Sequence, residues 1–323
     1  MRIFVTGGTG YIGQALCRRL REEGHEVRAL VRSTSRVEPL QELGVATFTG
    51  DIGDRVSMRE GMSGADWVVH AAALLDPGAS EERMQAANVS GSDNVASLAY
   101  KLGVGRFLSV SSMAYWGGSP DDGSLADETS PLQRPFPTPY SATKYAGEQA
   151  IQAWAKQGLK VNTVYPGLVY GPPGKKEGAN ILLRNLLKGR FPALVGADRK
   201  TSWIYLDDVV DGMRRAMEAP PGRGYLLAGD VATVRELANE VGRLGGVKVP
   251  KVDLPVPLVR WLILVATPFY RMRGRRPPMP AAQTRSLGRH WAFSDRRARE
   301  ELGFRPRSLA DGLPPTIDYL RAS

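Results

Sequence analysis

Tyr140 and Lys144 form the pair of side chains whose types and spacing most directly suggest chemistry. Residues four apart on a helix share one face. A free tyrosine has a pKa of about 10, too high for an efficient base near neutral pH, but a nearby ammonium stabilises the phenolate and lowers that pKa. The pair therefore predicts proton transfer at an alcohol or carbonyl oxygen. The spacing alone is common on unrelated helices, where it means only surface packing.

A glycine-rich turn near the N-terminus indicates a second kind of site. Gly8, Gly10 and Gly13 match G-x-G-x-x-G, and the segment also reads T-G-x-x-G-x-x-G from Thr6 and Gly7. The turn follows a predicted strand over residues 2–6 and opens a helix that runs to about residue 23, which is the context that a dinucleotide-binding turn requires. Glycine permits close approach to a pyrophosphate, and the helix N-terminus offers N–H groups to it. A purely structural turn is the alternative.

The residues after the second predicted strand, over 26–31, bear on the kind of dinucleotide. An NAD site usually carries Asp or Glu here to accept from the ribose hydroxyls, whereas this chain has Arg32 and Ser33. A guanidinium suits a 2′-phosphate. The sequence therefore favours NADP(H), with NAD(H) open and with a surface role for Arg32 as the alternative.

These groups need a scaffold, and the chain alternates short apolar runs with amphipathic ones. We expect further strands over 45–50, 66–72, 106–110 and 161–165, and helices over 81–102 and 140–157. Such alternation predicts an α/β fold, a Rossmann-type doubly wound parallel sheet with a smaller C-terminal substrate-binding α/β domain. Residues 1–165 plus about 201–232 would form the dinucleotide-binding domain, and about 166–200 plus 233–323 the substrate-binding domain.

Composition excludes several classes of protein. The 323 residues are 42% hydrophobic and 24% charged, as in ordinary globular proteins. Cys17 is the only cysteine and the three histidines are far apart, so we expect no disulfide and no metal site. Without a secretory signal or a spanning apolar run, a cytoplasmic location is expected.

The net charge of +10 is concentrated near the C-terminus, because residues 260–307 hold 12 arginines and 3 acidic residues. No nucleic-acid motif accompanies this charge, so nucleic acid is not expected as a partner. The preceding stretch, 254–270, is apolar with Arg260 as its one charge. It could be a core helix, could line a hydrophobic pocket, or, as residues 254–276, could make a peripheral membrane contact.

Further motifs follow the glycine turn in order: Gly50-Asp51-Ile52, His70-Ala71-Ala72-Ala73, Asn88 in N-V-S-G, Ser111 to Gly117, Tyr140-Ser141-Ala142-Thr143-Lys144, and Tyr165-Pro166-Gly167-Leu168-Val169-Tyr170-Gly171-Pro172. The chain thereby resembles the extended short-chain dehydrogenase/reductase superfamily over nearly its whole length. Tyr165 stands where the family has arginine. The resemblance implies a cofactor site of Gly7, Thr9, Gly10, Tyr11, Ile12, Gly13, Arg32, Ser33, Asp51, Ile52, Ala71, Ala72, Ala73, Asn88, Ser111, Tyr140, Lys144, Pro166, Gly167 and Val169.

The resemblance also assigns roles. Ser112, five residues before Gly117, matches the family's catalytic serine, with Ser111 as the competing choice, and acts with Tyr140 and Lys144. Dehydratases of the family carry acidic residues after that serine, whereas this chain has Met113 and Ala114. The C-terminal half is similar to the dihydroflavonol-4-reductase-like, 3β-hydroxysteroid-dehydrogenase-like and 2-alkyl-3-ketoalkanoate-reductase-like branches, and also to hopanoid-associated sugar epimerases.

We therefore expect an NADP(H)-dependent oxidoreductase that reduces a ketone, or oxidises a secondary alcohol, on a moderately apolar small molecule. The alternative is a nucleotide-sugar 4-epimerase with tightly held NAD, and a cofactor-sensing binder is disfavoured because it would not need the three catalytic groups. Many relatives dimerise, so a homodimer is open. Candidate substrate contacts, each of which could equally be core, are Leu74, Met113, Trp116, Leu168 and Trp203.

Overall fold

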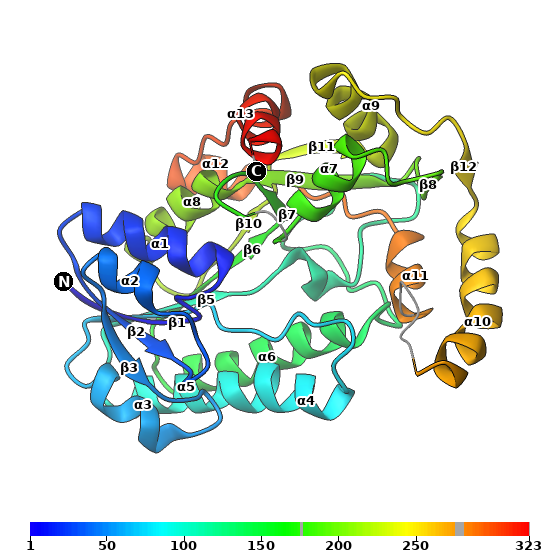
Figure 1. Ribbon diagram of the computed structural model, residues 1–323. Coiled ribbons are helices and arrows are strands. Elements are labelled where there is room, and N and C mark those ends of the chain that lie inside the picture. The colour runs from blue at the N-terminus through cyan, green and yellow to red at the C-terminus, as the bar shows by residue number, and fades with distance from the viewer. Residues whose placement is uncertain (175–176, 275–280, 323) are drawn as a thin grey trace.

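The computed structural model describes residues 1–174, 177–274 and 281–322, and its central element is a seven-stranded parallel sheet (Figure 1). The strands lie in the order β10 (Gly224–Leu227), β6 (Val161–Pro166), β5 (Arg106–Val110), β4 (Trp67–His70), β1 (Arg2–Thr6), β2 (Glu26–Val31) and β3 (Ala46–Thr49). This is the doubly wound order 3-2-1-4-5-6 with one strand added beside β6. The predicted fold class is confirmed.

Helices cover both faces of this sheet, which explains why its central strands are almost wholly apolar. Figure 1 shows α1 (Tyr11–Glu22), α2 (Glu38–Glu42), α8 (Leu206–Glu218) and α12 (Arg296–Leu302) above the sheet. Below it lie α3 (Arg55–Met62), α4 (Glu81–Gln85), α5 (Gly91–Lys101) and α6 (Pro139–Ala155). On α1 the buried residues Gly13, Leu16, Cys17 and Leu20 recur at helical spacing and face the sheet.

The predicted helix over 81–102 is interrupted by one π-helical turn, Ala86–Ser90, between α4 and α5. This turn packs directly against α6. A Cβ added to Gly147 of α6 would lie 2.0 Å from the carbonyl oxygen of Asn88, so only glycine permits this approach. The π-turn and α6 therefore have one fixed separation.

A smaller unit is built from C-terminal segments. Its three-stranded sheet has the order β11 (Asp230–Thr233), β9 (Lys200–Tyr205) and β7 (Leu168–Tyr170). Helices α7 (Asn180–Leu187), α9 (Val234–Gly245) and α13 (Leu309–Arg321) share a buried cluster with it. β8 (Leu194–Val195) and β12 (Asp253–Leu254) pair separately, and α10 (Val256–Met272) and α11 (Ala281–Leu287) follow at the right of Figure 1.

The chain crosses between the two sheets several times. Within residues 201–232, β9 and β11 pair in the smaller sheet, whereas α8 packs on the large sheet and β10 extends it. The division into domains at residues 165, 200 and 232 stays a prediction. Both sheets contribute to one junction, where β6, the single-turn helix η2 (Met113–Trp116) and residues 291–293 share a buried cluster.

The contact at Gly147 gives a stability test. Gly147→Ala should lower the free energy of unfolding by about 1–3 kcal/mol, because the methyl group overpacks a rigid backbone contact, although alanine is the better helix former. The measurement is the midpoint of urea-induced unfolding, compared between proteins whose unfolding transitions have the same m-value. Gly288→Ala is the control, since its Cβ would meet no atom closer than 3.4 Å. An unchanged midpoint for Gly147→Ala would contradict the packing.

Candidate active site

The predicted catalytic residues meet at the carboxyl edge of the large sheet. Ser112 follows β5, the glycine turn follows β1, and α6 carries both Tyr140 and Lys144. The start of α6 is fixed by Thr138, whose hydroxyl accepts from the Ser141 amide at 3.1 Å. Ligands of open α/β sheets bind at this edge.

Tyr140 lies beside Ser112. Both side chains are partly exposed, and the Ser112 hydroxyl also accepts from the Ala114 amide at 3.2 Å. Burial raises the pKa of Tyr140 to about 12, and the nearby Ser112 hydroxyl opposes that shift. The phenol is therefore protonated at neutral pH, the form that can donate a proton.

Lys144 does not lower the pKa of Tyr140 as the spacing suggested. Its ammonium donates instead to the carbonyl oxygen of Val110, at the end of β5, at 2.9 Å. Burial lowers the pKa of Lys144 to about 8, and the charge of Glu148 opposes that shift. The pKa of Tyr140 is raised and not lowered because loss of solvation is the largest influence on the phenol.

Glu148 is a buried carboxyl group that the sequence analysis missed. It lies one turn after Lys144 and is 5% exposed. It accepts a hydrogen bond from the hydroxyl of Tyr165, the residue that stands in place of the family's arginine. Burial raises the pKa of Glu148 to about 7, opposed by Tyr165, by the buried Ser111 hydroxyl and by Lys144. A neutral tyrosine thus faces this carboxyl at the position where the family has an arginine.

Asn88 connects the loop after β4 to the catalytic helix. Its side-chain oxygen accepts from the Leu74 amide at 2.7 Å, and its nitrogen donates to the Leu74 carbonyl at 3.1 Å and to the Thr143 hydroxyl at 3.0 Å. The π-helical turn places this amide between the two segments. Asn88 is a predicted cofactor residue, and the structure gives it a positioning role next to Lys144.

The glycine turn has the shape of a phosphate cradle. Gly7 has φ +77°, and a Cβ there would lie 2.6 Å from the Ala72 amide nitrogen, while a Cβ on Gly13 would lie 2.1 Å from the Gly7 carbonyl. Helix α1 begins after Gly10, and no side chain of the described residues accepts a capping hydrogen bond from the first N–H groups of this helix. Its first N–H groups therefore remain available to an anion, as a dinucleotide requires.

The other predicted cofactor residues lie around this cradle or behind it. Thr9 and Gly10 are exposed, as are Arg32, Ser33 and Asp51; Ile12, Ile52, Ala71, Ala72, Ala73 and Gly167 are partly exposed; Ser111, Pro166 and Val169 are buried. The Tyr11 hydroxyl donates to the Gly171 carbonyl and so ties α1 to the segment after β7. These residues fit an NAD(P) group, and the start of α1 would hold its phosphates.

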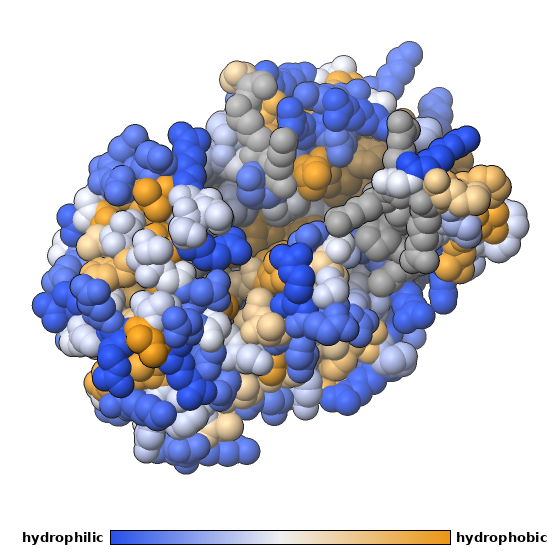
Figure 2. Space-filling view, turned by 60° about the horizontal axis from the view of Figure 1, so that its bottom comes forward, coloured by the Kyte–Doolittle hydropathy of each residue, from blue (hydrophilic) through white to orange (hydrophobic). Residues whose placement is uncertain are grey.

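The predicted substrate contacts separate into two groups. Met113 and Trp116 are buried in the cluster at the junction of the sheets, with Leu168 packed against it. Leu74 is partly exposed and is bonded to Asn88. Trp203 lies instead in the buried cluster of the smaller sheet, where its indole N–H donates to the Ala232 carbonyl at 3.1 Å. Figure 2 shows a hollow near the middle of one face with hydrophobic surface on its walls.

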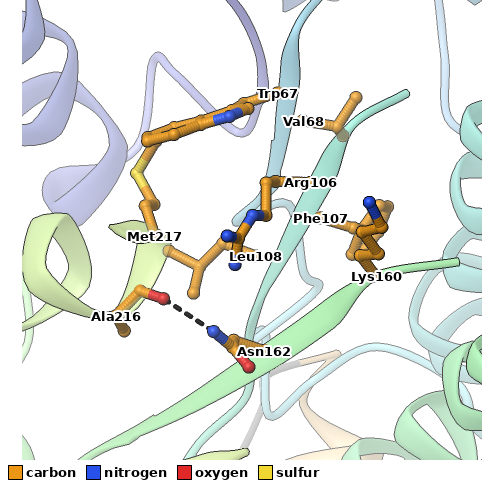
Figure 3. Close-up of a pocket in the computed structure, with 9 residues that line it drawn as sticks. All are labelled: Trp67, Val68, Arg106, Phe107, Leu108, Lys160, Asn162, Ala216 and Met217. Atoms are coloured by element: carbon orange, nitrogen blue, oxygen red, sulfur yellow. Dashed lines mark hydrogen bonds between the residues drawn. The ribbon is translucent and has the colours of Figure 1, made fainter. Parts of the chain in front are cut away.

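A different, small pocket lies at the opposite edge of the large sheet, where β4, β5 and β6 begin (Figure 3). Trp67, Arg106 and Met217 line it, and the Asn162 amide donates to the Ala216 carbonyl at 2.8 Å beside it. The Arg106 guanidinium donates to the Ala219 carbonyl. These polar groups hold α8 on the sheet, so we assign this pocket no chemistry.

Comparison with known proteins agrees with this geometry. The sequence model of the NAD dependent epimerase/dehydratase family matches residues 3–228. The chain belongs to this family. It is therefore an NAD(P)-dependent enzyme of the extended short-chain dehydrogenase/reductase type, as the resemblance implied.

Three known proteins illustrate the range of similarity. The 2-alkyl-3-oxoalkanoate reductase of Stenotrophomonas maltophilia is 32% identical, over 97% of each chain. A ketoreductase of Stigmatella aurantiaca, whose named substrate is a farnesylated dihydroquinoline oxide, is 31% identical over 94% of this chain and 92% of its own. The solved UDP-glucose 4-epimerase of Thermus thermophilus, in complex with NAD, has a TM-score of 0.77 at 25% identity and covers all of both chains.

The raised pKa of Glu148 gives a pH-dependent prediction. Because the folded state binds this proton more tightly than the unfolded chain, stability falls as pH rises from about 4.5 through about 7 and stays lower above. Glu148→Gln removes that loss. We expect the variant to match the wild type near pH 5 and to be more stable, by on the order of 2 kcal/mol, near pH 8.

The measurement is urea unfolding of both proteins at the two pH values. Glu60→Gln, on the exposed face of α3, is the matched control and should change little at either pH. A stability difference for Glu148→Gln that is the same at both pH values would show that the carboxyl does not titrate in this range.

Proposed function

We propose that the chain is an NADP(H)-dependent reductase of a ketone carried by a moderately apolar small molecule. The observation that carries the proposal is the side-by-side placement of a protonated Tyr140 phenol and the Ser112 hydroxyl next to apolar Met113. The two hydroxyl groups can donate hydrogen bonds to a carbonyl oxygen, and Met113 offers an apolar contact to the carbon skeleton of the substrate. The names of the ketoreductase relatives support the same class of substrate.

Each residue then has a defined task. A bound nicotinamide nucleotide would supply the hydride to the carbonyl carbon. Ser112 would hold the carbonyl oxygen, and Tyr140 would give that oxygen the proton that completes the alcohol. Lys144, fixed to the Val110 carbonyl, would keep a positive charge near the phenol as its proton leaves. The same groups would serve the reverse oxidation.

The preference for NADP(H) rests on the end of β2. Arg32 and Ser33 are exposed there, and no acidic residue occurs from residue 29 to residue 37. An exposed guanidinium can form two parallel hydrogen bonds to a 2′-phosphate. The ribose hydroxyls of NAD, in contrast, would lack their usual carboxylate acceptor.

A nucleotide-sugar 4-epimerase with tightly held NAD is the second candidate, favoured by the similarity to the solved UDP-glucose 4-epimerase. The apolar surroundings of Ser112 and the arginine after β2 weigh against it. Dehydration is disfavoured because Met113 and Ala114 follow Ser112, where an acid and a base would be needed.

Tyr140→Phe tests the assigned acid. With NADPH and a panel of aliphatic ketones and 3-oxo acids, the variant should lose about 10²–10⁴-fold in kcat, because the proton donor is removed while the ring still packs. NADPH affinity should hardly change. Tyr100→Phe, at an exposed position on α5, is the control. Equal turnover by Tyr140→Phe and wild type would refute the role.

Arg32→Ala tests the cofactor. The change should raise the KM for NADPH by about 10–100-fold, the worth of charge-assisted bonds to a phosphate, and leave the KM for NADH almost unchanged. Arg18→Ala, an exposed arginine on α1, controls for loss of general positive charge. If the KM values for NADPH and NADH rise by the same factor, Arg32 does not recognise the 2′-phosphate.

A further inference from the structure

Helix α10 is apolar on the face that it turns to solvent. Large apolar side chains on this helix have exposed fractions between 43% and 74%, namely Leu258, Trp261, Leu262, Leu264, Val265, Phe269 and Met272. They are seven of the fourteen large apolar side chains that the structure shows as exposed in its described residues, and the other seven are spread over the rest of the chain. Scattered exposed apolar residues are ordinary, whereas a contiguous group marks a contact surface.

Their spacing makes them one stripe. Leu258, Trp261, Leu262, Val265, Phe269 and Met272 recur at intervals of three and four residues, which places them along one side of a helix. The opposite side, with Val259, Ile263 and Tyr270, is partly buried, and the main packing partner of α10 is α11. An ordinary surface helix is apolar on one side only, but α10 is apolar on both.

The charge around this stripe has one sign. From residue 254 to residue 294 the sequence has seven arginines and neither aspartate nor glutamate. Arg260 and Arg273 are exposed on α10 and just after it, and Arg285 is exposed on α11. Residues 275 and 276, part of the segment singled out from the sequence, lie outside the described residues. The nearest preceding acidic residue, Asp253, is paired with Arg235. An apolar stripe whose own helix carries only cations complements a surface that is apolar inside and anionic outside.

We infer that α10 lies in the interface of an anionic lipid bilayer, with its exposed stripe among the acyl chains and its arginines at the headgroups. The helix has 17 residues and is about 25 Å long, and it would rest in the plane of the membrane. Within the described residues, the structure contains no helix with the length and apolar composition needed to cross a bilayer. In Figure 2 the stripe is the orange surface at the right-hand edge, where Figure 1 places α10.

A second copy of the chain fits this face less well. Apposing two α10 helices about a two-fold axis would bring the exposed Arg260 and Arg273 of each copy toward those of the other, with no acidic residue on either helix to offset them. Like charges opposed across an interface cost free energy, while anionic headgroups would neutralise them. The inference does not depend on the reaction that the enzyme catalyses.

The test is co-sedimentation of the full-length protein with vesicles of phosphatidylcholine containing roughly 30 mol % phosphatidylglycerol, and with phosphatidylcholine alone. We expect binding to the anionic vesicles that weakens with added salt. Trp261→Ser/Phe269→Ser should weaken it at least tenfold by removing buried apolar area, and Arg260→Gln/Arg273→Gln should weaken it about tenfold or more. Leu125→Ser, an exposed apolar position outside α10, is the control and should bind like the wild type.

Thermal unfolding of each variant checks that the fold is intact. A second readout uses Trp261 itself: vesicles should shift the tryptophan fluorescence of the wild type to the blue, and Trp261→Phe should lose that shift while still sedimenting. Absence of wild-type binding, or equal binding by the serine double variant, would overturn the inference. A dimer in solution that the same double variant disperses, without vesicle binding, would also overturn it and would give this face to a second copy.

Discussion

The contact between Gly147 of α6 and the carbonyl group of Asn88 is the constraint on which the catalytic geometry depends. Because Gly147 has no side chain, the backbone of α6 can contact the backbone of the π-helical turn directly. The same turn aims the Asn88 amide at Leu74 and Thr143, so a single packing contact sets the loop after β4 and the helix that carries Tyr140 and Lys144. The Val110 carbonyl then receives the Lys144 ammonium at a fixed point of the sheet edge.

The second determinant is electrostatic. Glu148 is buried and Tyr140 and Lys144 are partly buried beside it. The loss of solvation there disfavours their charged forms, so the phenol keeps its proton and the pKa of the Glu148 carboxyl is raised to about 7. Tyr165, which stands in place of the family's arginine, donates a hydrogen bond to Glu148 and brings no positive charge to it. The Tyr140 phenol is protonated at neutral pH, which is the form from which a proton can pass to a carbonyl oxygen.

Much of the scaffold could be predicted from the sequence. The strands Arg2–Thr6, Glu26–Val31 and Arg106–Val110 have the predicted bounds because short apolar runs between breakers leave little freedom. Proximity of Ser112, Tyr140 and Lys144 followed from motif order along a fold whose strands end at one edge. The cofactor preference and the substrate class stay predictions, because they depend on side chains whose ligand no sequence pattern names.

Other features could not be predicted, for physical reasons. A π-helical turn adds one residue to an otherwise helical stretch and changes no composition, so residues 81–102 gave no sign of it. Glu148 does not stand out in the sequence from a surface glutamate, and only the fold buries it and brings it into contact with Tyr165, 17 residues away. The α10 stripe was visible as apolar residues, but only the structure shows that half of them face outward.

The most direct test of the central claim, that the enzyme is a reductase with an exchangeable cofactor, is to denature the freshly purified protein and to identify and quantify the nicotinamide nucleotide that it releases. We expect well under one equivalent of nucleotide per chain, and preferential binding of NADPH when cofactor is added back. Near-stoichiometric NAD(H) would rule out an exchangeable cofactor, because it would show a retained and recycled cofactor and would assign the site to epimerisation.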